Sequence, residues 1–123
     1  MFTHENVNPK EKVVGDCVIR AIARAEDKPW IEVFDTLTEI ARKTYNVPSD
    51  TKVYSKYLKK YEKINVFNQT NGSKKRLKVK EICDLKGSYI VRVAGHLTAV
   101  VDGSIRDTWD CSNKSSYIIW KVK

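Results

Sequence analysis

The sequence lacks the cysteine patterns that bind metals or cross-link small secreted domains. Its three cysteines, Cys17, Cys83 and Cys111, are an odd number, and no CxxC pair or His/Cys cluster is present. The sequence therefore predicts no zinc site, no other metal and no cofactor. In a reducing compartment the three thiols are expected to be free.

Long apolar runs are also missing. No segment approaches the ~20 apolar residues that a membrane-spanning helix needs. The first residues, Met1–Asn6, have neither the basic nor the apolar region of a secretory signal. We therefore expect a cytoplasmic protein with no membrane partner.

Internal repeats and low-complexity linkers are absent too. The 123 residues, 41% of them hydrophobic, are therefore expected to form one domain (1–123) with a core of its own. Residues 1–13 show little hydrophobic periodicity, which predicts an extended N-terminal arm lying on that domain.

The chain carries an excess of positive charge. The chain has 23 Lys and Arg against 15 Asp and Glu, a net charge of +8, which raises its affinity for polyanions. The basic residues concentrate in Gly72–Lys80. We interpret this run as a solvated loop leading into a helix, with a nucleic-acid-binding domain as the alternative that it supports.

Hydrophobic periodicity predicts three helices in the first half of the chain. A short helix covers residues 17–25, with Asp16 as its N-cap. A longer helix covers residues 29–44, and a third starts at Pro48–Asp50.

The second half is rich in β-branched and aromatic residues. A short strand over 64–67, a polar loop through Asn71–Gly72 and a short helix over 79–85 are expected first. Four strands follow, over residues 89–94, 97–101, 104–108 and 117–122. Helices followed by an antiparallel sheet are typical of an α+β fold.

A hairpin is predicted to bring two chemically useful side chains together. Asp102-Gly103 is a two-residue turn signal between two of the predicted strands. In that register Val101 faces Ser104, and His96 and Asp107 lie diagonally opposite on one face of the sheet. An imidazole and a carboxylate in these positions are expected to reach hydrogen-bonding distance.

Cys17 adds a thiol at the start of a helix, where exposed backbone N–H groups favour its thiolate form. A neighbouring His96 would take the thiol proton, and Asp107 would orient the imidazole. The backbone N–H of Cys17 would also donate to a developing oxyanion. We call these three residues the triad.

The segments Gly15–Ala21, Gly95–Val101 and Asp107–Trp109 resemble the papain-like cysteine peptidase superfamily. There a Cys starts the central helix, a His opens a strand of the following sheet, and an Asn or Asp two residues before a Trp orients that His. The Asp-Cys pair is more similar to the peptidase domains of bacteriocin-processing transporters and to small papain-like proteins of bacteria and phages. The resemblance implies N-terminal helices, the nucleophile on the first, packed against a C-terminal antiparallel β-sheet.

The same family usually places a Gln about six positions before the Cys to complete the oxyanion hole. This chain has Glu11 there, with Asn6 and Asn8 further back. The resemblance therefore implies that Asn8 or Asn6 fills the role from the arm, or that the hole is incomplete. Asp16 and Trp109 are the remaining candidates on the substrate side, and Trp109 is expected to shield the bond between the triad's imidazole and carboxylate.

The expected activity is hydrolysis of an amide or thioester bond through an acyl-enzyme on Cys17, as a peptidase, isopeptidase or amidase acting on a protein or peptide. A papain-like fold without turnover, serving as a protein-binding or host-interfering module, is the alternative. Arg20 and Arg24 are interpreted as a solvated helix face that could also favour acidic substrates or C-terminal carboxylates.

Overall fold

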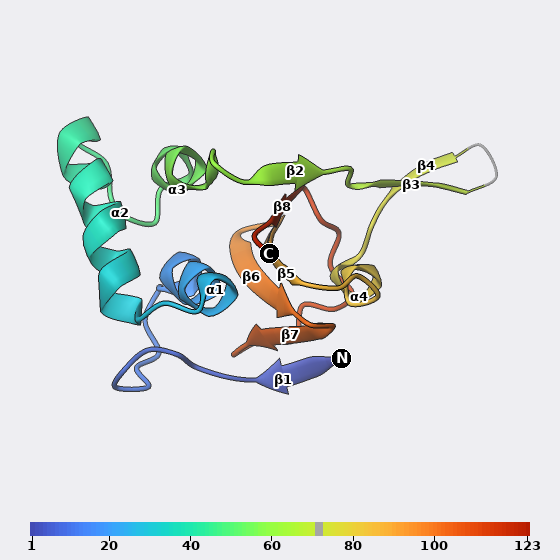
Figure 1. Ribbon diagram of the computed structural model, residues 1–123, viewed down its shortest axis with the longest axis horizontal. Coiled ribbons are helices and arrows are strands. Elements are labelled where there is room, and N and C mark those ends of the chain that lie inside the picture. Colours follow the sequence, from blue (N-terminus) through green and yellow to red (C-terminus); the bar gives the residue numbers. More distant parts are fainter. Residues whose placement is uncertain (71–72) are drawn as a thin grey trace.

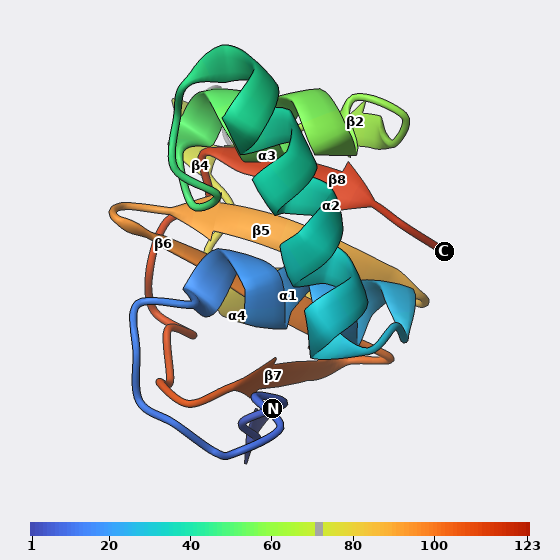
Figure 2. The ribbon, with the colours of Figure 1, turned by 90° about the vertical axis from the view of Figure 1, so that its left-hand side faces the viewer.

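The computed structural model describes residues 1–70 and 73–123, which form an α+β fold (Figure 1). Its helices are α1 (Cys17–Glu26), α2 (Trp30–Thr44), α3 (Thr51–Leu58) and α4 (Val79–Ile82). The main sheet has the strand order β1 (Phe2–His4), β7 (Ser104–Asp107), β6 (His96–Val101), β5 (Ser88–Val93), β8 (Ile118–Lys121) and β2 (Glu62–Ile64). A separate hairpin joins β3 (Phe67–Thr70) to β4 (Ser73–Arg76). Helices α1, α2 and α3 lie on one side of the main sheet and α4 on the other (Figures 1 and 2).

The main sheet is mixed, which corrects the prediction of helices followed by a purely antiparallel sheet. Strand β1 precedes all the helices and pairs in parallel with β7, where Phe2 lies opposite Ile105. The other pairings of the sheet are antiparallel. The expected arm over 1–13 therefore begins by satisfying the free backbone edge of β7. A three-residue strand is too short to show the alternation from which strands are predicted.

Side chains of the central strands alternate between two apolar layers. Ile90 and Leu97 face the helices, whereas Val91 and Val100 face α4. The helix-side layer also contains buried side chains from three helices and from β8: Ile22, Leu37, Leu58 and Trp120. Packing on these layers fixes where the first turn of α1 meets β6. Within the described residues, no helix combines the length and the apolar character needed to cross a membrane.

The hairpin between β6 and β7 has the predicted turn and register. Asp102 and Gly103 both adopt positive φ, 49° and 81°, as a tight two-residue hairpin turn requires. Val101 pairs with Ser104, which confirms the predicted register. A Cβ atom on Gly103 would lie 2.9 Å from the carbonyl oxygen of Cys83, so this turn also needs the absence of a side chain.

The segment between α3 and β5 differs from the prediction. The strand expected over 64–67 is divided between β2 and β3, and β4 replaces the first part of the basic loop. The guanidinium of Arg76 stacks on the rings of Phe67 and Tyr117, which stabilises the hairpin by contacts that sequence periodicity does not show. Helix α4 is shorter than expected, and the predicted loop at Asn71–Gly72 lies outside the described residues.

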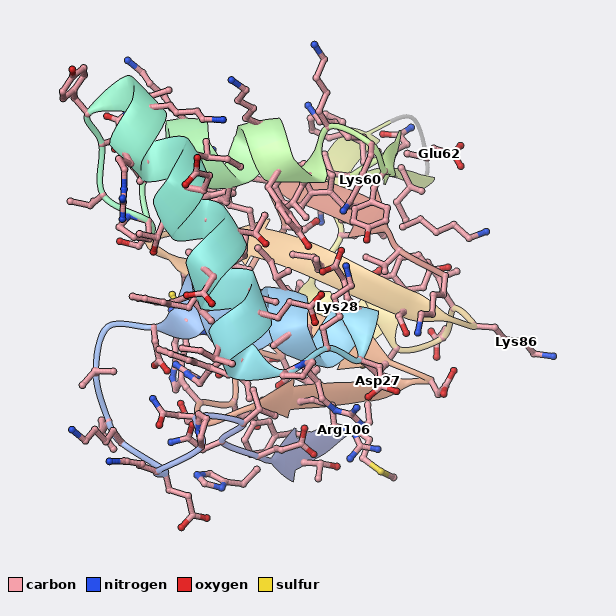
Figure 3. All side chains as sticks on the ribbon, turned by 60° about the vertical axis from the view of Figure 1, so that its left-hand side comes forward. Asp27, Lys28, Lys60, Glu62, Lys86 and Arg106 are labelled. Carbon is pink, nitrogen blue, oxygen red and sulfur yellow. The ribbon has the colours of Figure 1, made fainter. Side chains whose placement is uncertain are left out.

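A buried carboxylate joins the end of α1 to α3. Glu26 accepts hydrogen bonds from the hydroxyls of Tyr57, at 2.5 Å, and Tyr61. The ammonium groups of Lys28 and Lys60 lie 3.7 and 3.5 Å from the same carboxylate. Figure 3 shows the two lysines, which follow the ends of α1 and α3. Burial, together with this carboxylate, raises the pKa of both tyrosines, so both hydroxyls remain donors.

Candidate active site

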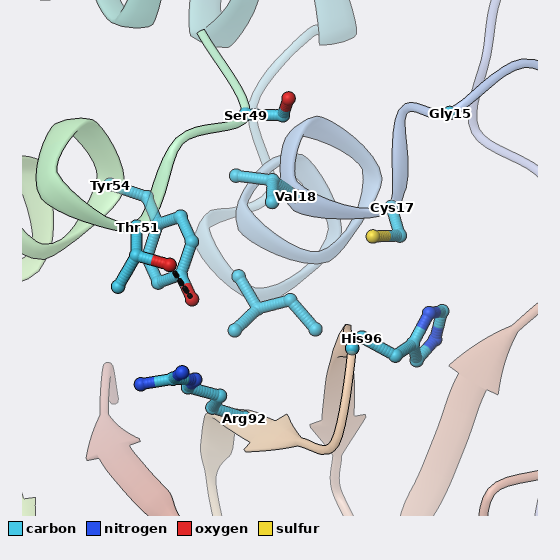
Figure 4. A pocket seen from close by; sticks show the side chains of 10 residues that line it. Gly15, Cys17, Val18, Ser49, Thr51, Tyr54, Arg92 and His96 are labelled. Carbon is cyan, nitrogen blue, oxygen red and sulfur yellow. Dashed lines mark hydrogen bonds between the residues drawn. The ribbon is translucent and has the colours of Figure 1, made fainter. Parts of the chain in front are cut away.

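The three triad residues occupy the ends of three elements. Cys17 is the first residue of α1, His96 is the first residue of β6, and Asp107 is the last residue of β7. Because α1 packs across β6, its N-terminus meets the start of that strand. Figure 4 shows the Cys17 thiol and the His96 ring side by side at one end of a pocket.

His96 and Asp107 form a short, part-buried hydrogen bond. The distance between His96 Nε2 and Asp107 Oδ2 is 2.6 Å, and Asp107 is only 3% exposed. Thr98 Oγ1 donates to the same oxygen at 2.7 Å, and the Thr108 N–H donates to Oδ1 at 2.7 Å. Burial alone would raise the Asp107 pKa, but bonds from His96 and Thr98 lower it. The ionised carboxylate only accepts, so Nε2 carries the proton.

The pKa shifts of the Cys17 thiol and the His96 imidazole both favour an ion pair between the two groups. Burial alone would raise the pKa of the Cys17 thiol. Hydrogen bonds from His96 and the Leu97 backbone outweigh burial, assisted by the charges of His96 and Arg20, and the pKa lies below its ordinary value. Burial would lower the pKa of His96, but its bonds to Asp107 and Cys17 raise it to about 9. Since Nε2 is bonded to Asp107, Nδ1 is the nitrogen left for the thiol.

Arg20 is not part of a solvated face, which corrects the prediction. Its guanidinium donates from Nε to Asp16 Oδ1 at 2.9 Å and from an Nη atom to Asp107 Oδ1 at 3.1 Å. A further bond reaches Thr108 Oγ1 at 3.2 Å. Arg24 is also paired, 2.7 Å from Glu5. Both arginines are therefore engaged within the protein, and neither of them lines the pocket beside Cys17.

Asp16 stands at the N-cap position of α1, but its side chain makes no capping bond. Its carboxylate instead accepts from Asn8 Nδ2 at 3.1 Å, from Arg20 Nε and from Trp30 Nε1 at 3.0 Å. The loop before Cys17 is thus held by three donors from the arm, α1 and α2. Asp16 is buried, so the structure places it behind the site and not on the substrate side.

The two candidate oxyanion residues lie away from the pocket. Asn8 is buried and donates to Asp16, whereas Asn6 donates to the carbonyl of Lys12 at 3.1 Å. Neither residue lines the pocket that contains the Cys17 thiol. The structure therefore provides no support for either amide as an oxyanion donor.

Trp109 covers the outer side of the imidazole. Its ring lies edge-on to the His96 ring, with centroids 5.0 Å apart and an interplanar angle of 84°. Trp109 is 43% exposed, so its outer face remains in water. This contact keeps solvent from one side of the His96–Asp107 bond.

A pocket of about 410 Å³ opens beside Cys17 and His96 (Figure 4). Its remaining lining residues are Gly15, Val18, Ser49, Thr51, Tyr54, Arg92, Gly95 and Leu97. They come from the loop before α1 and the first turn of that helix, from α3 and the turn that precedes it, and from the β5–β6 hairpin. A substrate that reached the thiol would lie against these side chains.

Cys111 lies close to His96 and Asp107, with ligand atoms of the three residues within 4.8 Å of one another. These groups suit a hydrogen-bonded cluster better than a metal ion. His96 Nε2 and Asp107 Oδ2 are bonded directly to each other, and burial raises the pKa of Cys111 to about 11, which keeps its thiol protonated.

Sequence reasoning missed two groups that hold the triad. Arg20 follows Asp16 by one helical turn, a spacing that indicates an ion pair, but its second partner is 87 residues away. Thr98 lies two residues after His96 and so shares its face of the strand. No sequence signal identifies the pocket residues on α3 and β5. Comparison of the chain with protein-family models, curated proteins and solved structures found no match.

Proposed function

We propose that this chain is a cysteine-dependent hydrolase of papain-like architecture, a peptidase, isopeptidase or amidase that acts through an acyl-enzyme on Cys17. The observation that carries the proposal is the position of the Cys17 thiol beside the His96 ring, whose Nε2 is hydrogen-bonded to the buried Asp107. The lowered pKa of the Cys17 thiol supports a reactive cysteine, because burial without such partners raises the pKa of a thiol. Cys111 shows that opposite effect in the same molecule.

In the acylation step, the Cys17 thiolate attacks the carbonyl carbon of the substrate and forms a C–S bond. The carbonyl oxygen becomes an oxyanion near the Cys17 N–H, one of the first-turn amides of α1 that have no intrahelical acceptor. The His96 imidazolium then gives its proton to the leaving nitrogen, and the C–N bond breaks. A thioester on Cys17 and a free amine result.

In the deacylation step, neutral His96 removes a proton from water, and the hydroxide attacks the thioester carbon. The C–S bond breaks, the carboxylic acid leaves, and the thiolate–imidazolium pair is restored. Asp107 remains ionised throughout and stabilises the imidazolium, with Thr98 and Arg20 holding the carboxylate in place.

A protein-binding module that uses the same pocket without turnover is the second candidate. The positions of Asn6 and Asn8 favour it, because their amides are bonded elsewhere and leave the oxyanion without a side-chain donor among those predicted. Loss of one oxyanion donor costs on the order of 100–1,000-fold in turnover. Such a protein would keep the reactive thiol but would turn over substrate very slowly.

The test measures the alkylation rate of each cysteine by iodoacetamide across a pH series in wild type and His96→Ala. We expect Cys17 to react rapidly well below the ordinary thiol pKa of about 8.5 and to lose this advantage in the variant. Cys83 and Cys111 are the controls within the same molecule. A Cys17 that reacts like Cys83 would contradict the proposal.

Turnover is measured separately with p-nitrophenyl acetate. A hydrolase forms an acetyl thioester on Cys17, seen by mass spectrometry, and releases it to give continuous nitrophenol production. An acetyl group that accumulates and persists would identify the binding module. Cys17→Ser provides the background rate of the folded protein.

A further inference from the structure

The wall of the pocket opposite the triad is polar and carries one positive charge. Arg92 enters it from β5, the hydroxyls of Thr51 and Tyr54 enter it from α3, and Ser49 lines it from the turn before α3 (Figure 4). None of the residues that line the pocket is acidic. The guanidinium therefore faces hydroxyl groups and the space in which a substrate would lie.

Arg92 differs from Arg20 and Arg24 in its pairing among the described residues. Arg20 and Arg24 are each paired with acidic side chains, whereas Arg92 makes no ion pair with any residue in the part of the chain that the structure describes. Its side chain is half-buried, so it has given up part of its hydration. A half-buried guanidinium without a partner is disposed to bind an anion that supplies one.

Strand pairing links Arg92 to Leu97, a residue that adjoins both His96 and the Cys17 thiol. Arg92 pairs with Leu97 across the β5–β6 hairpin, and the Leu97 backbone bonds to the Cys17 thiol. Leu97 belongs to the helix-side layer, and paired residues share a face of the sheet. Arg92 therefore projects from the sheet toward the helices, and Figure 4 shows its guanidinium below Thr51 and Tyr54, at the end of the pocket away from Cys17.

We infer that this wall is a carboxylate-binding subsite, in which Arg92 selects substrates that place a carboxylate at the opposite end of the pocket from the bond attacked by Cys17. The inference rests on the proposed function for the reaction and adds the substrate class. A guanidinium offers two parallel N–H donors that match a carboxylate. Tyr54 Oη donates to Thr51 Oγ1 at 3.4 Å, which leaves the Thr51 hydroxyl hydrogen free for a bound oxygen. The carboxylate is an acidic side chain or a chain terminus.

The first experiment uses affinity labels of matched length. Bromoacetyl derivatives of glycine, β-alanine, 4-aminobutyric acid and 6-aminohexanoic acid are prepared as free acids and as primary amides. The rate of Cys17 alkylation by each acid is divided by the rate for its amide. In wild type we expect the acid to be favoured by roughly tenfold at the best chain length, the effect of one charged hydrogen-bonded contact.

Arg92→Gln should remove this preference, and Arg92→Lys should keep part of it. Arg42→Gln is the matched control, because Arg42 is exposed on α2 and contributes the same net charge. The amide rates report the thiolate alone, so they should be equal in all four proteins. An acid-to-amide ratio that is the same in wild type and Arg92→Gln would overturn the subsite while leaving the hydrolase intact.

The second experiment does not need a reactive thiol. In Cys17→Ala, the Arg92 Nε–H resonance is followed while the protein is titrated with N-acetylglutamic acid α-amide, N-acetylglutamine or N-acetylglutaminamide. The first carries only a side-chain carboxylate, the second only an α-carboxylate, and the third neither. A shift with one acid and not with the diamide identifies the source of the carboxylate. An unmoved resonance with all three would overturn the inference whatever the reactivity of Cys17.

Discussion

Arg20 and Asp107 form an ion pair, 3.1 Å between an Nη atom and Oδ1, that joins the first turn of α1 to the end of β7. Because Cys17 begins α1 and Asp107 holds His96, this pair also sets the position of the thiol relative to the imidazole. The second bond of Arg20, to Asp16, holds the loop before Cys17. We therefore regard Arg20 as a positioning residue.

In Arg20→Met, the pH at which the alkylation rate of Cys17 increases should be higher than in wild type. The charge of Arg20 contributes to the lowered pKa of the thiol, and without it Asp107 also loses one of its donors. Buried Asp16 loses its cation and Asp107 keeps only the His96 imidazolium, so the free energy of unfolding should fall by about 2–4 kcal/mol. The measurements are a pH profile of alkylation by mass spectrometry and urea denaturation.

Arg24→Met is the control on the same helix, since Arg24 pairs with Glu5 and not with the site. It should leave the pH profile unchanged, and Arg20→Lys should restore part of the profile. A profile that moved equally in Arg20→Met and Arg24→Met would show that only net charge matters.

Asp107→Asn should lower the pKa of His96 from about 9 toward the ordinary value of about 6.5. The raised pKa means that the imidazolium persists as the pH rises to about 9, while the lowered thiol pKa means that the thiolate forms below its ordinary range. The ion pair therefore exists between the lowered pKa of the thiol and a pH of about 9, and the substitution narrows that range from its basic side. The measurement is the titration of the His96 ring by NMR.

Asp110→Asn gives the same charge change three residues further along the chain, at an exposed position where the carboxylate accepts from the Ser112 N–H. His96 should titrate there as in wild type. If His96 kept a pKa near 9 in Asp107→Asn, another group would be responsible for its protonation.

Local signals in the sequence predicted the parts of the site that depend on local structure. The turn at Asp102-Gly103 gave the register of β6 and β7, and the helix start placed Cys17 at an N-terminus. Partners distant in the chain were not predicted. Arg20 was expected to be solvated because its helix position is opposite the apolar side, and nothing nearby in the sequence shows that Asp107 lies there. Strand β1 depends in the same way on the distant edge of β7.

Gly103→Ala should destabilise the protein by about 1–3 kcal/mol, because Ala is strained at φ 81° and its Cβ would meet the Cys83 carbonyl. Gly95→Ala is the matched comparison in the β5–β6 hairpin. Gly95 also has positive φ, 65°, but no atom lies within 4 Å of the added Cβ. Urea denaturation should show the larger loss for Gly103→Ala. Equal losses would mean that the contact with Cys83 relaxes without cost.

Glu26→Ala should reduce the free energy of unfolding by about 2–4 kcal/mol, since it leaves the hydroxyls of Tyr57 and Tyr61 without their buried acceptor. Glu39→Ala is the control. Its carboxylate is exposed and pairs with Lys43 at 3.5 Å on the surface of α2, so the loss should stay below about 0.5 kcal/mol.

The same variant separates stability from the site. Glu26 and Cys17 are the last and first residues of α1, a helix of 10 residues whose ends lie ~15 Å apart. The folded Glu26→Ala protein should therefore alkylate Cys17 at the wild-type rate and with the wild-type pH profile, despite its lower stability. A slower rate in fully folded protein would mean that the contact between α1 and α3 also fixes the position of the thiol. In that case the side chains of α3 that line the pocket would act on the nucleophile as well as on the substrate.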